Sequence, residues 1–164
     1  MLRAIAAVSA DGGLGRNGQL LFHIPEDLRR FKDLTTGKAV IMGRATLDSL
    51  PGGRPLPNRR NLVLTRNKSF QRPGVEVFHS PEELLHALGE ADGWVIGGAE
   101  VYALLLPLCR ELYLTRVCTA PEADRFFPAL GDEWTLLEDS APRTGQGLVW
   151  RYQVYEQMRP QAAV

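Results

Sequence analysis

The chain has 164 residues, its 19 Lys and Arg balance 19 Asp and Glu, and 45% of its residues are hydrophobic. This composition is typical of one globular domain and excludes a fibrous chain or one that is disordered throughout. No apolar run reaches the roughly 18 residues that a membrane helix needs, and the sequence of Met1–Ile5 does not resemble a signal peptide. We therefore expect a cytoplasmic protein without a membrane partner.

Short apolar runs alternate with amphipathic segments along the chain. Prolines at a first helical position, Pro25 and Pro81, mark two helix starts, and Ser80 is the expected N-cap of the second. In chain order we expect a strand over 4–8, a helix over 25–36, a strand over 39–42, a helix over 44–50, strands over 61–65 and 75–78, a helix over 81–88, a strand over 94–96, a helix over 99–106, and strands over 112–118, 134–138 and 149–156.

This alternation predicts an α/β fold with a central, mostly parallel β-sheet. The last two strands have no helix between them, so we expect an antiparallel hairpin at one edge of the sheet. We predict a single domain over residues 1–160 and a disordered tail over 161–164. Cys109 and Cys118 form no disulfide framework, and both are expected in the core. The three histidines are dispersed, so no metal site is predicted.

The neutral total charge conceals an uneven distribution. Residues 38–72 contain eight Lys and Arg and one acidic residue, Asp48, whereas residues 73–164 contain six Lys and Arg and fourteen Asp and Glu. A block of like charge in a balanced chain favours an anionic partner. The alternative is an ordinary solvated surface.

Residues 13–18, Gly-Leu-Gly-Arg-Asn-Gly, match the glycine pattern of dinucleotide-binding proteins. In that motif a helix begins within the glycines, because its N-terminus binds the pyrophosphate. Here the next helix begins only at Pro25, so we exclude the Rossmann interpretation. The segment is more typical of a mobile glycine-rich lid over a site or of a plain surface loop.

Two other segments have the pattern of a strand that ends in glycine just before a helix, Val40–Thr46 and Val95–Ala99. Exposed backbone N–H groups at such a junction can bind phosphate, and glycine lets the ligand approach. Parallel strands would place both junctions at the carboxyl edge of the sheet. Together with the basic segment they predict an extended anionic ligand such as a dinucleotide, with Arg44 and Arg66 on an extra phosphate.

Asp27 borders the apolar stripe of the first helix, next to Leu28 and four residues before Phe31. One interpretation is an exposed carboxylate in the first helical turn. The other is a carboxylate in an apolar pocket, where it would bind two adjacent N–H groups of a ligand and its pKa would rise.

Several segments, taken in chain order, resemble the dihydrofolate reductase family in its bacterial chromosomal form. They are Ile5–Ala7, Asp11–Gly15, Pro25–Leu28 with Phe31 and Lys32, Val40–Thr46, Gly53–Arg59, Ile96–Gly98 with Tyr102, Leu112–Thr115, and Asp124 with Phe127 and Pro128. Each segment alone is common, but the ordered combination is specific and covers nearly the whole chain. The resemblance implies a three-layer fold with about four helices, and an adenosine-binding subdomain at about residues 38–90.

The resemblance also implies roles for residues around a substrate. Asp27 is expected to bind the N3 and 2-amino edge of a pterin, with Thr115 bonded behind it, and Arg59 to bind the α-carboxylate of a glutamate tail. The expected substrate-binding residues are Ile5, Ala6, Ala7, Asp27, Leu28, Phe31, Lys32, Leu50, Leu56, Arg59, Ile96 and Thr115. The expected catalytic residues are Asp27, Phe22, Tyr102 and Thr115, and Phe22 stands where the family commonly has tryptophan.

NADPH is the cofactor that the resemblance implies, because Arg44 and Arg66 favour it over NADH. The expected cofactor-binding residues are Ala7, Leu14, Gly15, Gly43, Arg44, Ala45, Thr46, Leu64, Thr65, Arg66, Ile96, Gly97, Gly98, Ala99, Val101 and Tyr102. The family has a cis peptide at the position of Gly97–Gly98. Glu100 stands where some relatives have a basic residue.

The implied reaction reduces 7,8-dihydrofolate to 5,6,7,8-tetrahydrofolate by hydride transfer to C6 and protonation of N5, in one-carbon and thymidylate metabolism. We expect a monomer that also binds antifolate inhibitors. A pyrimidine reductase of riboflavin synthesis shares the fold, but Asp27 and Arg59 fit a pterin and a glutamate tail better. A nucleic-acid-binding module is disfavoured, because Phe70 is the only aromatic residue in the basic segment. A dinucleotide-binding protein without turnover is the third alternative.

Overall fold

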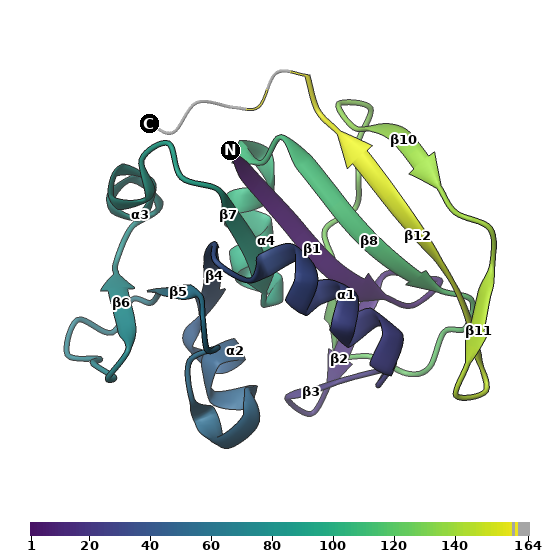
Figure 1. The fold of residues 1–164 in the computed structure, drawn as a ribbon, viewed down its shortest axis with the longest axis horizontal. Helices are drawn as coiled ribbons and strands as arrows, with labels where there is room; N and C mark the ends of the chain where they lie inside the picture. Colours follow the sequence, from purple (N-terminus) through teal and green to yellow (C-terminus); the bar gives the residue numbers. More distant parts are fainter. Residues whose placement is uncertain (159, 161–164) are drawn as a thin grey trace.

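The computed structural model describes residues 1–158 and Pro160, and its strands form two sheets (Figure 1). The strands of the larger sheet are β1 (Leu2–Val8), β4 (Ala39–Gly43), β5 (Arg60–Leu64), β6 (Val75–Phe78), β7 (Gly93–Gly97), β8 (Glu111–Val117), β10 (Thr135–Asp139), β11 (Arg143–Gly145) and β12 (Leu148–Glu156). Within the described part of the chain they lie in the order β10-β12-β8-β1-β7-β4-β5-β6, with β11 beside β12.

The larger sheet is parallel from β8 through β1, β7, β4 and β5 to β6. Its other edge is antiparallel, because β12 runs against β8, β10 and β11. The predicted α/β class, the mostly parallel sheet and the antiparallel C-terminal hairpin are therefore confirmed. The hairpin has one strand more than expected, since the three-residue β11 is too short for an apolar pattern to indicate it.

The helices are α1 (Pro25–Thr35), α2 (Arg44–Ser49), α3 (Pro81–Leu88) and α4 (Ala99–Leu105), with 3₁₀ turns at Pro51–Gly53 and Leu106–Leu108. Proline occupies the first turn of α1 and of α3, as predicted. The hydroxyl of Ser80 accepts a hydrogen bond from the backbone N–H of Glu83 at 3.2 Å, which confirms the expected N-cap. No helix of the described residues is long and apolar enough to cross a membrane.

Side chains along the strands point alternately to the two faces of the sheet, so the core is divided into a cluster on each face. In β1, Ala4, Ala6 and Val8 pack with α3 and α4, whereas Ile5 packs in a second cluster that includes Phe31 of α1. Strands β4, β5 and β7 alternate in the same way, because successive side chains of a strand point to opposite faces. Figure 1 shows the resulting layers, with α1 on one side of the sheet and α4 on the other. The predicted three-layer fold is confirmed.

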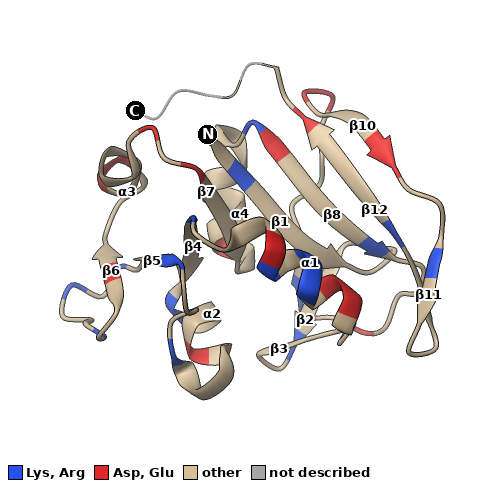
Figure 2. Ribbon diagram, in the orientation of Figure 1, with Lys and Arg blue, Asp and Glu red and all other residues tan. Residues whose placement is uncertain are grey.

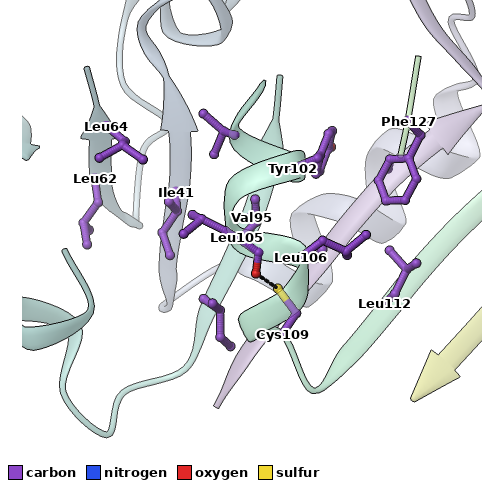
Figure 3. Close-up of a cluster of buried hydrophobic side chains, with 14 of the residues drawn as sticks. Ile41, Leu62, Leu64, Val95, Tyr102, Leu105, Leu106, Cys109, Leu112 and Phe127 are labelled. Carbon is purple, nitrogen blue, oxygen red and sulfur yellow. Dashed lines mark hydrogen bonds between the residues drawn. The ribbon is translucent and has the colours of Figure 1, made fainter. Parts of the chain in front are cut away.

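Figure 3 shows the core cluster between the sheet and α4, where Leu105 and Tyr102 contact residues of the strands. Cys109 is fully buried there, and its Sγ donates to the carbonyl oxygen of Leu105 at 3.3 Å. The expectation that Cys109 lies in the core is confirmed. The same expectation for Cys118 is wrong, because Cys118 follows the last residue of β8 and is exposed.

A second, three-stranded sheet contains β2 (Gly13–Arg16), β3 (Gln19–Leu20) and β9 (Arg125–Phe126) in the order β3-β2-β9. The sequence predicted a loop here, and strands of two to four residues rich in glycine give no apolar alternation that would have indicated otherwise. No helix begins before Pro25, as the exclusion of a Rossmann motif requires. The predicted disordered tail, 161–164, lies outside the described residues.

Candidate functional site

The two strand-glycine-helix junctions lie side by side at the carboxyl edge of the parallel strands. Gly43, the last residue of β4, is paired with Leu64 of β5, and Met42 is paired with Gly97 at the end of β7. Helices α2 and α4 begin directly after these strands. Ligands of open α/β sheets bind at this edge, so the sequence-based expectation about the two junctions agrees with the strand register.

Side chains of α2 and α4 pack closely against the glycines of the two junctions. The peptide bond between Gly97 and Gly98 is cis, as the family resemblance implied. A Cβ on Gly97 would lie 3.2 Å from Oγ1 of Thr46 in α2, and a Cβ on Gly43 would lie 3.1 Å from a methyl carbon of Val101 in α4. Gly97 also has a φ of 135°, which disfavours every residue with a side chain. Glycine is therefore required where the strand ends meet.

Basic side chains border this edge of the sheet. The guanidinium of Arg44 stacks on the ring of Phe70, 4.7 Å from its centroid, and its Nε lies 3.6 Å from Oδ2 of Asp48. Arg72 stacks on the same ring and donates to the other oxygen of Asp48 at 2.7 Å. Arg66 is exposed just after β5. Figure 2 shows Lys and Arg around α2 and β5, so the basic segment of the sequence is also clustered in space.

Asp27 lies in the first turn of α1, and its side chain reaches the sheet. Its Oδ1 accepts a hydrogen bond of 2.6 Å from the hydroxyl of Thr115, a buried residue of β8. Burial raises the pKa of the Asp27 carboxyl, while the bond from Thr115 and the nearby charge of Arg30 act in the opposite direction. Asp27 is therefore partly buried with a raised pKa, as the pocket interpretation requires, whereas its binding of two ligand N–H groups stays a prediction.

An apolar cluster lies between α1 and the sheet. It brings together five of the residues that the resemblance assigned to a substrate pocket, Ile5, Phe31, Leu50, Leu56 and Ile96. Leu28 is 46% exposed, although it is on the same helix, and Lys32 is exposed as well. Apolar side chains from four separate parts of the chain thus form one wall, and Leu28 is free to contact a ligand.

Arg59 is held at the end of this wall by α1 and by its own loop. Its Nη1 donates to the hydroxyl of Thr35 at 3.1 Å and its Nε to the carbonyl oxygen of Pro57 at 2.9 Å. Burial lowers the pKa of Arg59, and no carboxylate of the described residues forms an ion pair with it. A partly buried cation without an acidic partner is suited to an anionic ligand.

Other predicted site residues are buried or half-buried. The hydroxyl of Tyr102 donates to the carbonyl oxygen of Ile5 at 2.7 Å, and burial raises its pKa far above the usual value. Phe22 packs against a separate cluster that contains Ile24 and Trp150. Residues whose side chains pack on the α4 face of the larger sheet are Ala6, Leu14, Leu64, Ala99 and Val101. Ala7 is half-buried and paired with Thr115, and a Cβ on Gly15 would lie 2.6 Å from the carbonyl oxygen of Gln19.

The structure shows two charged groups beside Asp27, those of Glu26 and Arg30, whose contacts the sequence did not indicate. Both carboxylate oxygens of Glu26 accept from Arg143 of β11, at 2.7 and 2.8 Å, and Oε2 also accepts from the hydroxyl of Tyr152. These bonds lower the pKa of Glu26 to about 2. Arg30 lies over the ring of Tyr152. A sequence pattern could not predict the contact between Glu26 and Arg143, since the two residues are 117 positions apart in the chain.

Comparisons with known proteins agree with this arrangement. A family model described as dihydrofolate reductase matches residues 1–159. The dihydrofolate reductase of Mycobacterium leprae is 44% identical over 156 residues, which cover 92% of this chain and 94% of that relative. The Bacillus subtilis enzyme is 38% identical over 139 residues, covering 84% and 82% of the two chains. A solved structure of dihydrofolate reductase from Enterococcus faecalis, complexed with NADP(H) and RAB-propyl, superposes with a TM-score of 0.89 and 35% identity over 97% of each chain. The chain therefore belongs to the dihydrofolate reductase family and is an oxidoreductase.

Proposed function

We propose that this protein reduces 7,8-dihydrofolate to 5,6,7,8-tetrahydrofolate with NADPH. The observation that carries the proposal is the partly buried carboxyl of Asp27, bonded to Thr115 at one end of an apolar wall that ends at Arg59. A carboxylate and a guanidinium joined by apolar residues match a ligand with a pterin at one end and a glutamate at the other. Membership of the family supports the same substrate.

The substrate is bound by residues of α1 and of the strand ends. Asp27 accepts hydrogen bonds from N3 and the 2-amino group of the pterin, and two-point binding of this kind fixes the ring in its plane. Phe31, Leu50 and Leu56 exclude water from the ring and the aminobenzoyl group. Arg59 binds the α-carboxylate of the tail, because Thr35 and Pro57 hold its guanidinium at the end of the wall.

The residues at the carboxyl edge of the sheet fit NADPH. Glycine at 43, 97 and 98 leaves the backbone bare where the strands end, and Thr46 lies against the Gly97–Gly98 peptide. Arg44 and Arg66 supply positive charge for the additional phosphate that distinguishes NADPH from NADH. Residues 38–90 would then hold the adenosine half of the cofactor. The similar Enterococcus faecalis structure is a complex with NADP(H), which supports this choice of cofactor.

The chain contributes positioning, exclusion of water and electrostatics to the reaction. When bound, reduced nicotinamide supplies the hydride that is transferred to C6 of dihydrofolate. The protein holds C6 close to the hydride donor, which replaces a bimolecular encounter with a prearranged one. Asp27 stabilises the form of the pterin that carries a proton, and N5 takes that proton from solvent. Asp27 therefore acts on N5 from across the ring, at the N3 and 2-amino edge.

The test is NADPH oxidation with dihydrofolate by the parent and by Asp27→Asn. Near pH 7 we expect the variant to lose activity by about 100-fold or more, because the proton-requiring state loses its negative partner. At low pH, where part of the substrate is already protonated, the loss should become smaller. Undiminished turnover by Asp27→Asn at neutral pH would contradict the role of Asp27. NADPH binding without any turnover by the parent would support the idle dinucleotide-binding protein.

A further inference from the structure

Arg30 lies one helical turn after Asp27 in α1, in an unusual environment for a guanidinium. Its Cζ lies 4.1 Å from the centroid of the Tyr152 ring and 5.6 Å from that of Tyr113. Its Nη1 is buried and donates to no acceptor of the described residues. The side chain is therefore held by two ring faces, which attract a cation without neutralising it.

The acidic residue best placed to neutralise Arg30 is engaged elsewhere. Residues four apart face each other on a helix, so Glu26 is the expected ion-pair partner of Arg30. The carboxylate of Glu26 instead accepts two bonds from Arg143 and one from Tyr152. No ion pair of Arg30 occurs within the described residues. Its charge consequently remains uncompensated.

Two carboxyl groups of α1 lie three residues from Arg30, the exposed Asp33 and the partly buried Asp27, and of these Asp27 reaches β8, which Arg30 also contacts. Residues three apart are also neighbours on a helix surface, and Arg30 follows Asp27 by three. Both side chains lie against β8, since Asp27 contacts Thr115 and Arg30 contacts Tyr113, and Arg30 also contacts Tyr152 of β12. An unpaired positive charge in partly buried surroundings acts strongly on a nearby carboxyl, because little water screens it.

We propose that Arg30 is a positioning residue that keeps Asp27 ionised over the pH range in which the enzyme works. This rests on the proposed function of Asp27 and deepens it, because burial favours the protonated carboxyl, which cannot accept both pterin N–H groups, and the charge of Arg30 acts against burial. The Glu26–Arg143–Tyr152 cluster serves the same end, since it diverts Glu26 from Arg30.

The other charged and titratable groups around Asp27 do not replace this effect. From α1, the ionised Glu26 raises the pKa of Asp27, and Arg143 of β11 offsets that charge by pairing with Glu26. From β8, Thr115 donates a hydrogen bond but carries no charge, and the pKa of Tyr113 is raised by burial. From β12, Tyr152 is also neutral, because burial and its bond to Glu26 raise its pKa to about 12. Arg30 is the cation that acts on Asp27 directly.

The experiment is a pH titration of the Asp27 carboxyl carbon by NMR in the enzyme without substrate, with the signal assigned by its loss in Asp27→Asn. Arg30→Met removes the charge and keeps a chain that can pack on the two rings. We expect its titration midpoint about one pH unit above that of the parent, as for the loss of an opposite charge near a carboxyl. Arg30→Lys, which retains the charge, should return the midpoint to within a few tenths of the parent value.

Arg29→Met is the matched control, because it removes the same charge from the same helix at a position that does not face Asp27. A shift in Arg30→Met but not in Arg29→Met supports the proposal. Coincident midpoints in Arg30→Met and the parent overturn it, as does an equal shift in Arg29→Met. If Arg30→Met does not fold, Arg30→Gln, which retains a planar polar group, is held to the same criteria. The titration monitors the free enzyme, so its outcome is independent of whether dihydrofolate is the substrate.

Discussion

At the scale of single residues, Asp27 combines a position that favours its charge with surroundings that oppose it. The first turn of a helix attracts an acidic side chain, and Thr115 donates a hydrogen bond to the charged form. Burial is nevertheless the larger influence, and the pKa of Asp27 is raised above its ordinary value. A carboxyl that ionises reluctantly is costly to keep in the fold, and such groups are typical of functional sites.

The cost should be measurable as a gain in stability when Asp27 is replaced by Asn. The pKa of Asp27 is higher in the folded chain than in the unfolded chain. Between these two pKa values the folded chain binds more protons, so the free energy of unfolding falls as the pH rises through this interval. We expect Asp27→Asn to melt a few degrees above the parent at pH 7, with the advantage vanishing below the unfolded pKa of Asp, about 3.9. Melting curves followed by circular dichroism at pH 7 and at low pH measure the difference. A variant that is less stable than the parent at pH 7 would contradict the expectation.

The sequence indicated Asp27 but not the contacts that set its ionisation. Asp27 was detectable because it borders the apolar stripe of a helix, a pattern contained within a few neighbouring residues. The position of Arg30 depends on Tyr113 and Tyr152, and the engagement of Glu26 depends on Arg143. Those partners come from strands far along the chain, so only the folded structure shows that Arg30 is left without an acidic partner.

At the scale of elements, Asn61 at the start of β5 braces the loop that carries Leu56 and Arg59. Its Nδ2 donates to the carbonyl oxygens of Leu56 and Arg59 at 2.9 and 3.0 Å, and its Oδ1 accepts from the N–H of Leu56 at 2.9 Å. The side chain is only 3% exposed, so water cannot readily replace these bonds. Asn61 therefore fixes the loop that carries Leu56 and Arg59 relative to the sheet.

Replacing Asn61 by Ala should weaken substrate binding more than turnover. Three partly buried backbone groups would lose their partner, at a cost of about 1–3 kcal/mol in folding stability. We expect the KM for dihydrofolate to rise by about tenfold, with kcat within a factor of two to three, because in the proposed complex the loop binds the tail and does not touch the reacting carbon. Steady-state kinetics and thermal melting measure the two effects. Asn67→Ala, in an exposed turn, is the control, and an equal rise in KM there would contradict the role of Asn61.

Helices and strands could be predicted from the sequence where they contain enough residues for an apolar pattern to appear. Helix α1 and strands β1, β4 and β8 have enough residues for an apolar stripe or run to appear, and their predicted bounds differ from the structure by at most two residues. The small sheet β3-β2-β9 was missed, because its two-residue strands are defined by their partners. Their pairing joins residues 13–20 to residues 125–126, which no local pattern contains.

At the scale of the whole molecule, the neutral chain separates into a basic and an acidic region. Figure 2 shows Lys and Arg around α2, β5 and the loop before β6, while β10 at the opposite edge of the sheet is acidic. Within the basic region, ion pairs engage Arg44 and Arg72 with Asp48 and Arg60 with Glu76. Arg66 has no such partner within the described residues, and the pair of Arg44 is long and exposed. Exposed pairs of this kind contribute little stability, so Arg44 can exchange Asp48 for a phosphate at small cost.

The preference of the basic region for NADPH over NADH should therefore depend on Arg44 and Arg66 and not on the total charge of the region. We expect Arg44→Ala with Arg66→Ala to weaken NADPH binding by about 100-fold and NADH binding by no more than about threefold, because each arginine lost from a phosphate costs roughly 1.5 kcal/mol or more. Lys38→Ala with Arg54→Ala removes the same charge from the same segment and should weaken both cofactors slightly and equally. Quenching of protein fluorescence gives the six dissociation constants, for the parent and the two double variants with each cofactor. If the control pair reduced NADPH binding as much as the Arg44 and Arg66 pair, long-range attraction by the region as a whole would account for the preference, and the specific contacts would not.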